Sequence, residues 1–157
     1  MRIRRASAKD LGAIVGLNGM TRADRQRRQL VAQALRENSV YILDDGEIHG
    51  CAILRRNFFH RYFLEMLFVD EDYRRSGWGD KLLARAELIA MKSGELWTST
   101  NRSNLSMRSL LRKHGFRRTG HIIGLDAGDA EIFYVKKQPD QAISCRRAAD
   151  GGRGHGA

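Results

Sequence analysis

The sequence has few of the features that mark secreted or membrane proteins. It contains two cysteines, Cys51 and Cys145, too few for a disulfide framework, which favours a reducing, cytoplasmic compartment. No apolar run is long enough to cross a bilayer. The basic start, Met1 to Arg5, is not followed by the apolar segment of a signal peptide. We therefore expect neither a membrane protein nor a secreted one.

Proline is also scarce, and its single occurrence marks a change in composition. Pro139 opens a C-terminal stretch dominated by Arg, Ala, Asp and Gly, in which no segment can bury a core. We expect one domain over residues 1–137 and a disordered, basic and glycine-rich tail over residues 138–157. The chain of 157 residues, 42% of them apolar, is long enough for one hydrophobic core.

Acidic residues are outnumbered by basic ones, 18 against 28, which gives a formal net charge of +10. This surplus attracts polyanions, so it suits nucleic acid, an anionic membrane surface or a cofactor that carries phosphates, and does not choose between them. The most basic segment, Arg22 to Arg28, is interpreted as a solvated helix face. The alternative is a binding rim for an acidic acceptor or for RNA.

Residues 62–91 predict a buried strand, a charged turn and a helix with two glycines in its first turn. The first N–H groups of a helix have no partner within it, and the helix dipole is positive there. Gly77 and Gly79 let an anion approach this backbone closely, and Arg74 and Arg75 add positive charge. The stretch therefore predicts a diphosphate-binding corner.

The rest of the chain alternates between strand and helix patterns. We expect a tight turn at residues 44–46, a bulge at Gly50 and the order β-α-α-β-β-β-α-β-α-β-β. The expected strands cover residues 2–6, 40–43, 47–56, 62–69, 95–100, 116–125 and 130–136, and the expected helices cover residues 7–20, 21–37, 77–93 and 104–114.

The corner Arg74-Arg-Ser-Gly77-Trp-Gly79 resembles the acyl-coenzyme-A loop of the GNAT superfamily of N-acyltransferases, Gln/Arg-x-x-Gly-x-Gly/Ala. Residues 64–69 are similar to the family's fourth strand. Residues 104–116 are similar to its second motif, Asn-x-x-Ala/Ser-x-x-Leu-Tyr-x-Lys-x-Gly-Phe. The resemblance covers residues 3–135 and implies an α/β (α+β) fold. In that fold a mixed, mostly antiparallel sheet is flanked by helices, and its splayed central strands hold the coenzyme.

The resemblance also implies acetyl-coenzyme A as co-substrate and no metal. It implies these coenzyme-binding residues: Leu67, Phe68, Val69, Arg74, Arg75, Ser76, Gly77, Trp78, Gly79, Asn104 and Arg108. A backbone N–H near Leu67 is the family's usual donor to the thioester oxygen. Two side chains have alternatives, since Trp78 either stacks on a base or packs its helix onto the sheet, and Arg108 either reaches the phosphates or is solvated. Asp80 places a negative charge close to the expected phosphates.

Glu65 is the candidate general base, because it lies in an apolar strand where burial of an isolated carboxylate favours proton uptake. The alternative is a carboxylate that faces solvent or pairs with an arginine such as Arg55. Leu111 stands where the family often has a tyrosine as general acid. Tyr134, His114 or solvent is expected to protonate the thiolate instead.

We therefore expect an N-acetyltransferase that moves an acetyl group from acetyl-coenzyme A to a primary amine by direct attack in a ternary complex. The alternative is a catalytically weak module that binds RNA or a protein through its basic surface. The diphosphate corner favours the enzyme and disfavours nucleic acid, and no membrane partner is expected. The sequence does not identify the acceptor, although its basic early helices suggest one with negative charge. A homodimer would be in keeping with the family.

Overall fold

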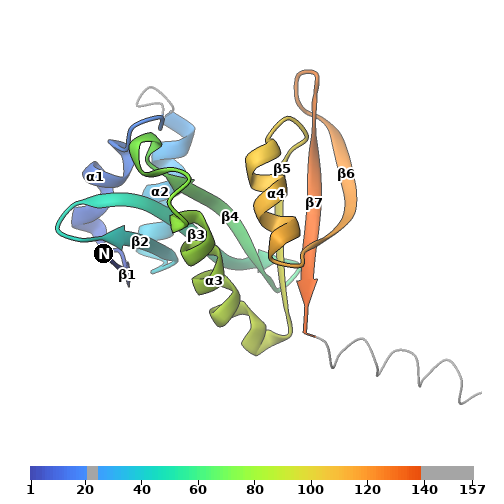
Figure 1. The fold of residues 1–157 in the computed structure, drawn as a ribbon, viewed down its shortest axis with the longest axis horizontal. Coiled ribbons are helices and arrows are strands. Elements are labelled where there is room, and N and C mark those ends of the chain that lie inside the picture. Colours follow the sequence, from blue (N-terminus) through green and yellow to red (C-terminus); the bar gives the residue numbers. More distant parts are fainter. Residues whose placement is uncertain (21–24, 139–157) are drawn as a thin grey trace, which may run out of the picture.

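The computed structural model describes residues 1–20 and 25–138 (Figure 1). The expected tail, apart from Gln138, and residues 22–24 of the basic segment lie outside the described residues. The strands are β1 (Arg2–Arg5), β2 (Val40–Asp44), β3 (Ile48–Phe58), β4 (Arg61–Val69), β5 (Glu95–Asn101), β6 (Arg117–Asp126) and β7 (Asp129–Lys137). The helices are α1 (Leu11–Val15), α2 (Arg25–Arg36), α3 (Trp78–Ala90) and α4 (Leu105–Lys113). Within the described residues, no helix is both long and apolar enough to span a membrane.

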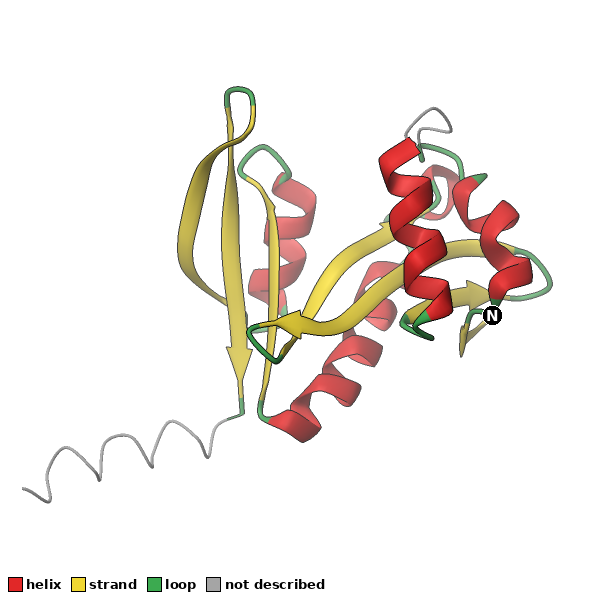
Figure 2. Ribbon diagram, turned by 180° about the vertical axis from the view of Figure 1, so that it is seen from behind, coloured by secondary structure: helices red, strands yellow, loops and turns green. Residues whose placement is uncertain are grey.

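All seven strands form one sheet in the order β1-β2-β3-β4-β5-β7-β6. Every neighbouring pair is antiparallel except β4 and β5, which are parallel. Helices α3 and α4 lie on one face of the sheet (Figure 1). Helices α1 and α2 cover the opposite face of the N-terminal half (Figure 2). The predicted element order and the predicted mixed, mostly antiparallel sheet flanked by helices are confirmed.

Each face of the sheet has its own hydrophobic core. One cluster joins α1 and α2 to the sheet through side chains such as Ile14 and Val31, both fully buried. The other joins α3 and α4 to the sheet through Leu82, Leu83 and Leu111, which are also fully buried. Burying one such aliphatic side chain contributes roughly 1.5–3 kcal/mol. These two clusters hold the helices in fixed positions on the sheet.

The first helix is shorter than expected. In the 3₁₀ turn Ala8–Asp10 that precedes it, Asp10 accepts a hydrogen bond from the backbone N–H of the N-cap residue Ser7 at 2.7 Å, as in a capping box. The helix ends at Val15, not near Met20, because Gly16 and Gly19 follow and Gly19 has a φ of +83°. A Cβ on Gly19 would also lie 2.5 Å from the Glu71 carboxylate, so this glycine lets the loop after β4 approach closely.

The bulge predicted at Gly50 lies one residue earlier. Leu43 pairs with Gly50 and Asp44 with Ile48, which leaves His49 as the extra residue. Gly50 has a different reason to be glycine, because a Cβ there would lie 2.7 Å from the carbonyl oxygen of Phe68. A close approach of β3 to β4 therefore replaces the predicted bulge at this residue.

Strands β4 and β5 pair over only three residues each and then separate. The last pair is Leu64 with Thr98, and the buried Thr98 hydroxyl donates a 2.8 Å hydrogen bond to the Leu64 carbonyl. On the other side of β4, Leu54 pairs with Leu64 and Ile53 with Met66, so Glu65 is the extra residue of a β-bulge. A bulge bends its strand, which turns the end of β4 away from β5. The separation that the resemblance implies is present and leaves two strand edges open inside the sheet.

Candidate active site

The turn between β4 and α3 has the backbone conformation of an anion-binding loop. Arg75 and Gly77 both have positive φ, 58° and 77°, and Gly77 is the N-cap of α3. Such turns direct successive N–H groups toward one point. The N–H groups of Ser76 and Gly77 donate to no described protein atom, and those of the first turn of α3 lack intrahelical partners. Nothing lies within 4 Å of a Cβ built on Gly77, so the space is open.

The three long side chains of this corner take different positions. Arg74 is held in the loop, where its Nε donates to the Val69 carbonyl at 3.1 Å and its guanidinium lies 5.5 Å from the Phe68 ring centre. Arg75 is exposed. Trp78 packs against the core beside α3, with the Lys81 ammonium 4.0 Å from its ring centre. Of the two alternatives for Trp78, the geometry agrees with packing of the helix onto the sheet.

A cavity of about 810 Å³ lies between this corner and α4. Its lining combines the end of β4, the loop, the first turn of α3 and the first two turns of α4. The lining residues are Leu67, Phe68, Val69, Glu71, Tyr73, Arg74, Arg75, Gly77, Gly79, Asp80, Asn104, Ser106, Met107 and Leu110. Asn104 is the N-cap of α4, and its Oδ1 accepts from the Met107 N–H at 3.1 Å. We refer to this space as the coenzyme cavity.

Asp80, the negative charge expected near the phosphates, has partners on α4. Its Oδ1 lies 2.5 Å from the Lys113 ammonium and 3.3 Å from His114 Nε2. Hydrogen bonding to Lys113, followed by that to His114, lowers the pKa of Asp80. The Lys113 ammonium therefore offsets the negative charge of Asp80 beside the coenzyme cavity.

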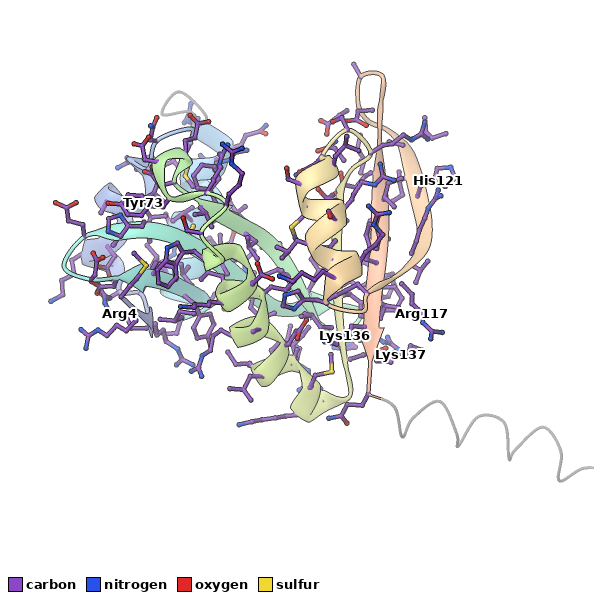
Figure 3. All side chains as sticks on the ribbon, viewed as in Figure 1. Arg4, Tyr73, Arg117, His121, Lys136 and Lys137 are labelled. Atoms are coloured by element: carbon purple, nitrogen blue, oxygen red, sulfur yellow. The ribbon has the colours of Figure 1, made fainter. Side chains whose placement is uncertain are left out.

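His114 is not placed to act as the acid proposed as a substitute for tyrosine. Its Nε2 faces Asp80, and its Nδ1 lies 3.0 Å from Glu87. Glu87 also accepts from Lys136 at 2.9 Å, and Lys136 reaches toward α3 from β7 (Figure 3). These contacts connect α3, α4 and β7, so His114 contributes to the packing of these elements.

A second cavity, of about 580 Å³, lies on the opposite side of the separated strands. It shares four lining residues with the coenzyme cavity: Leu67, Phe68, Asn104 and Met107. The rest of its lining comes from α2, β4, β5 and β7, namely Gln26, Arg27, Leu30, Leu64, Glu65, Met66, Thr98, Ser99, Thr100, Asn101 and Glu131. We refer to this space as the acceptor cavity. The two cavities meet where β4 and β5 part, so a group held in one can reach the other.

Glu65 lies in the acceptor cavity, as a general base must, but it is not the isolated carboxylate that the sequence suggested. Its side chain is 17% exposed and pairs with Arg55 at 3.1 Å, and Asn57 donates to it at 2.5 Å. Arg55 also pairs with Glu37 at 2.8 Å. The expected partner Arg55 is therefore present, and the ion pair fixes the direction in which the carboxylate points.

Tyr134 and Arg108 are not among the residues that line either cavity. Tyr134 is 4% exposed in the core under α4, and the Arg108 Nε donates to its hydroxyl at 3.4 Å. Arg108 also donates to the Arg102 carbonyl at 2.7 Å. This geometry therefore does not support the expected roles of Tyr134 in protonating the thiolate and of Arg108 in reaching the phosphates. Leu111, at the family's tyrosine position, is fully buried.

The lining residues that sequence reasoning did not propose include Asn101, Met107 and Glu131. Glu131 had a usable signal, since it alternates with the buried residues Ala130 and Ile132 and so faces away from α4. As for a metal, no group of three or more His, Cys, Asp or Glu side chains gathers suitably in residues 1–20 and 25–138. The donors present are backbone N–H groups and cations, which fit the phosphates of a coenzyme.

Comparison with known proteins agrees with this geometry. The family model described as Acetyltransferase (GNAT) family matches residues 12–116. A GNAT-family acetyltransferase from Bacillus cereus ATCC 10987 has 30% sequence identity and a TM-score of 0.75, and the match covers 87% of this chain and 96% of that one. No curated protein sequence matches the chain.

Two further solved structures share the fold. The ribosomal-protein-S18-alanine N-acetyltransferase from Escherichia coli has 21% identity and a TM-score of 0.72, over 87% of this chain and 92% of that one. An acetyltransferase from Bacillus anthracis str. Ames, solved in complex with acetyl coenzyme A, has 23% identity and a TM-score of 0.57, over 63% of this chain and 61% of that one. The family match and the relative at 30% identity agree, and this chain belongs to the GNAT acetyltransferase family.

Proposed function

We propose that the protein is an N-acetyltransferase that moves the acetyl group of acetyl-coenzyme A to a primary amine by direct attack in a ternary complex. The observation that carries this proposal is the junction of the two cavities at the separated strands. One cavity begins at a diphosphate corner and the other contains a carboxylate, so donor and acceptor approach each other from opposite faces of the sheet.

The chain's residues divide the work of the reaction. The free N–H groups at Ser76 and Gly77 bind the diphosphate, and the open edge of β4 at Leu67 to Val69 pairs with the pantetheine arm as an added strand would. The coenzyme supplies a thioester, whose carbonyl carbon accepts the amine. A backbone N–H of the open edge near Leu67 stabilises the charge that develops on the carbonyl oxygen.

Glu65 removes the proton from the acceptor. Its carboxylate, oriented by Arg55, takes a proton from the acceptor's ammonium, directly or through a water, and the amine nitrogen then attacks. A C–N bond forms, the C–S bond breaks, the electron pair leaves on the thiolate sulfur, and the nitrogen loses its second proton to solvent to give the amide. With Tyr134 enclosed under α4 and Leu111 apolar, solvent protonates the thiolate, which is already a good leaving group.

Release of free coenzyme A thiol from acetyl-coenzyme A, measured with a panel of amines, tests the activity. Cys51 will not interfere, because it is fully buried and burial raises the pKa of its thiol to about 12. A blank without amine corrects for Cys145. Glu65→Gln should lower kcat at neutral pH by about 10²–10⁴-fold and leave the KM for acetyl-coenzyme A unchanged. Full activity in this variant would remove Glu65 as the base.

Calorimetric titration with coenzyme A tests the diphosphate corner separately. Gly77→Asp should abolish uptake, because it places a carboxylate where the phosphates bind. Gly128→Asp is the matched control, since Gly128 has the same φ of +77° and the same open surroundings in the β6–β7 turn. Uptake by both variants alike would overturn the corner as the binding site. Salt-sensitive RNA binding together with no uptake of coenzyme A would favour the alternative, an RNA-binding module.

A further inference from the structure

We infer that Glu131 selects the acceptor: the amine that this enzyme acetylates carries a second cationic group, which pairs with the Glu131 carboxylate. The inference rests on the proposed function and names the chemistry of its acceptor. It reverses the suggestion, drawn from the basic early helices, of an acceptor with negative charge.

Glu131 is unusual among the carboxylates of this chain. Of the Asp and Glu side chains in residues 1–20 and 25–138, thirteen accept a hydrogen bond or form an ion pair: Asp10, Glu37, Asp44, Asp45, Glu65, Asp70, Glu71, Asp72, Asp80, Glu87, Glu95, Asp126 and Asp129. Glu47 and Glu131 do neither. Glu47 is exposed at the β2–β3 hairpin, whereas Glu131 is half-buried in the acceptor cavity.

Neither residue that pairs with Glu131 on the sheet forms a hydrogen bond with its carboxylate. Its pairing partners on the sheet are Asn101 of β5 and the apolar Ile122 of β6. The Asn101 amide nitrogen already donates to Asp126 at 2.7 Å. Arg27, a cationic residue of the same lining, has an interaction of its own. Partial removal of a carboxylate from water is unfavourable unless a cation or donor replaces the water. In a chain with ten more basic than acidic residues, a carboxylate left without a partner is therefore available to a ligand.

The position of Glu131 suits a second charge and not the reacting amine. Strand β7 is separated from β4 by β5, and neighbouring strands lie about 4.8 Å apart, so Glu131 is roughly 10 Å or more from the edge of β4 at Leu67. The thioester lies at that edge in the proposed reaction. Glu65, an extra residue of β4 itself, is the closer carboxylate and keeps the role of base. The two carboxylates therefore match two positive groups on one acceptor.

Two sources supply this chemistry: a free diamine, or a short peptide whose basic side chain lies near its amino terminus. We would measure thiol release with 1,4-diaminobutane against 1-aminobutane, and with Ala-Lys against Ala-Glu dipeptides. The diamine or Ala-Lys should have the lower KM, by about tenfold as expected for one partly buried charge pair. Whichever of these two reacts better identifies the source.

Glu131→Gln should remove this preference, because it keeps the size of the side chain but loses the charge. We expect its KM for the dicationic acceptor to rise about tenfold. Its kcat, its KM for acetyl-coenzyme A and its KM for 1-aminobutane should stay at the wild-type values. Glu47→Gln is the matched control and should change none of these constants. Glu131→Lys should invert the dipeptide preference toward Ala-Glu.

The two proposals fail in different ways. If acetyl-coenzyme A binds but no amine in the panel releases thiol, the proposed function fails. Calorimetric titration of the coenzyme-saturated protein with 1,4-diaminobutane then tests Glu131 alone, since heat lost in Glu131→Gln and kept in Glu47→Gln would support the site. Equal KM values for diamine and monoamine, or identical behaviour of the two Gln variants in either assay, would overturn the role of Glu131.

Discussion

Arg55 makes the ion pairs that hold Glu65, and replacing it gives a sharp test of this arrangement. The guanidinium is 8% exposed and pairs with two carboxylates, Glu65, which is 17% exposed, and Glu37, which is 45% exposed. Arg55→Met keeps much of the apolar volume but leaves the Glu65 carboxylate half-buried without its cation. Removing one partner of a buried pair costs about 3–5 kcal/mol, whereas exposed pairs contribute about 0–1 kcal/mol.

Because Glu37 is largely solvated, the loss at Glu65 should dominate. We expect Arg55→Met to lower the free energy of unfolding by about 2–3 kcal/mol, or the melting temperature by roughly 5–10 °C for a domain of this size. Urea denaturation followed by circular dichroism measures the change. Arg56→Met is the matched control, since Arg56 is exposed and donates only to the His60 carbonyl at 2.9 Å; its effect should stay within about 0.5 kcal/mol.

A second substitution distinguishes loss of the ion pair from loss of packing. Adding Glu65→Gln to Arg55→Met removes the charge that the first change left uncompensated, so the double variant should recover about 1 kcal/mol. If Arg55→Met is no more destabilising than Arg56→Met, Arg55 does not compensate the Glu65 charge. If the double variant recovers nothing, the destabilisation comes from packing and the electrostatic explanation is wrong.

Two further predictions concern charges elsewhere in the domain. Hydrogen bonds from Arg4 hold the pKa of Asp10 well below its usual range, so this pair stabilises the fold fully above the unfolded-state pKa of about 3.9 and loses that contribution as pH falls through the depressed value. Asp10→Asn should therefore flatten the decline of urea stability below about pH 4, and an unchanged slope would contradict the pair. Lys113→Met should weaken coenzyme A binding by about three- to tenfold in calorimetry, because the negative charge of Asp80 is then less neutralised. Adding Asp80→Asn to this variant should restore the binding. Without such a restoration, Lys113 does not act through Asp80.

Local patterns in the sequence were enough to predict the element order and the glycine-containing turn that precedes α3. The corner depends on residues within one turn, where Gly77 requires a left-handed conformation and the helix that follows has free N–H groups. The helix stop at Gly94, with a φ of +91°, is equally local. Features decided by neighbours along the chain could therefore be predicted from residue type and spacing alone.

Features that depend on contacts across the sheet could not be predicted in the same way. Arg55 was named only as one possible partner of Glu65, because the pairing depends on a strand register that contains a bulge, and Asp80 meets Lys113, which is 33 positions away in the sequence. Tyr134 was chosen for its hydroxyl, but strand alternation places it on the α4 face, with Ile132. Which face of β7 is covered depends on where α4 packs, and the sequence of β7 alone does not contain that information.

The separation of β4 and β5 also affects how the protein behaves among other proteins. Unpaired strand edges usually invite the addition of a foreign strand and lead to aggregation. The two edges opened beyond Leu64 and Thr98 are internal, with residues of α2 and α4 lining the space around them. An edge enclosed in this way is less accessible to the sheet of another molecule than the edge of an outer strand. The fold thus offers a ligand the hydrogen-bonding capacity of an edge without the risk of polymerisation that an outer strand such as β6 carries.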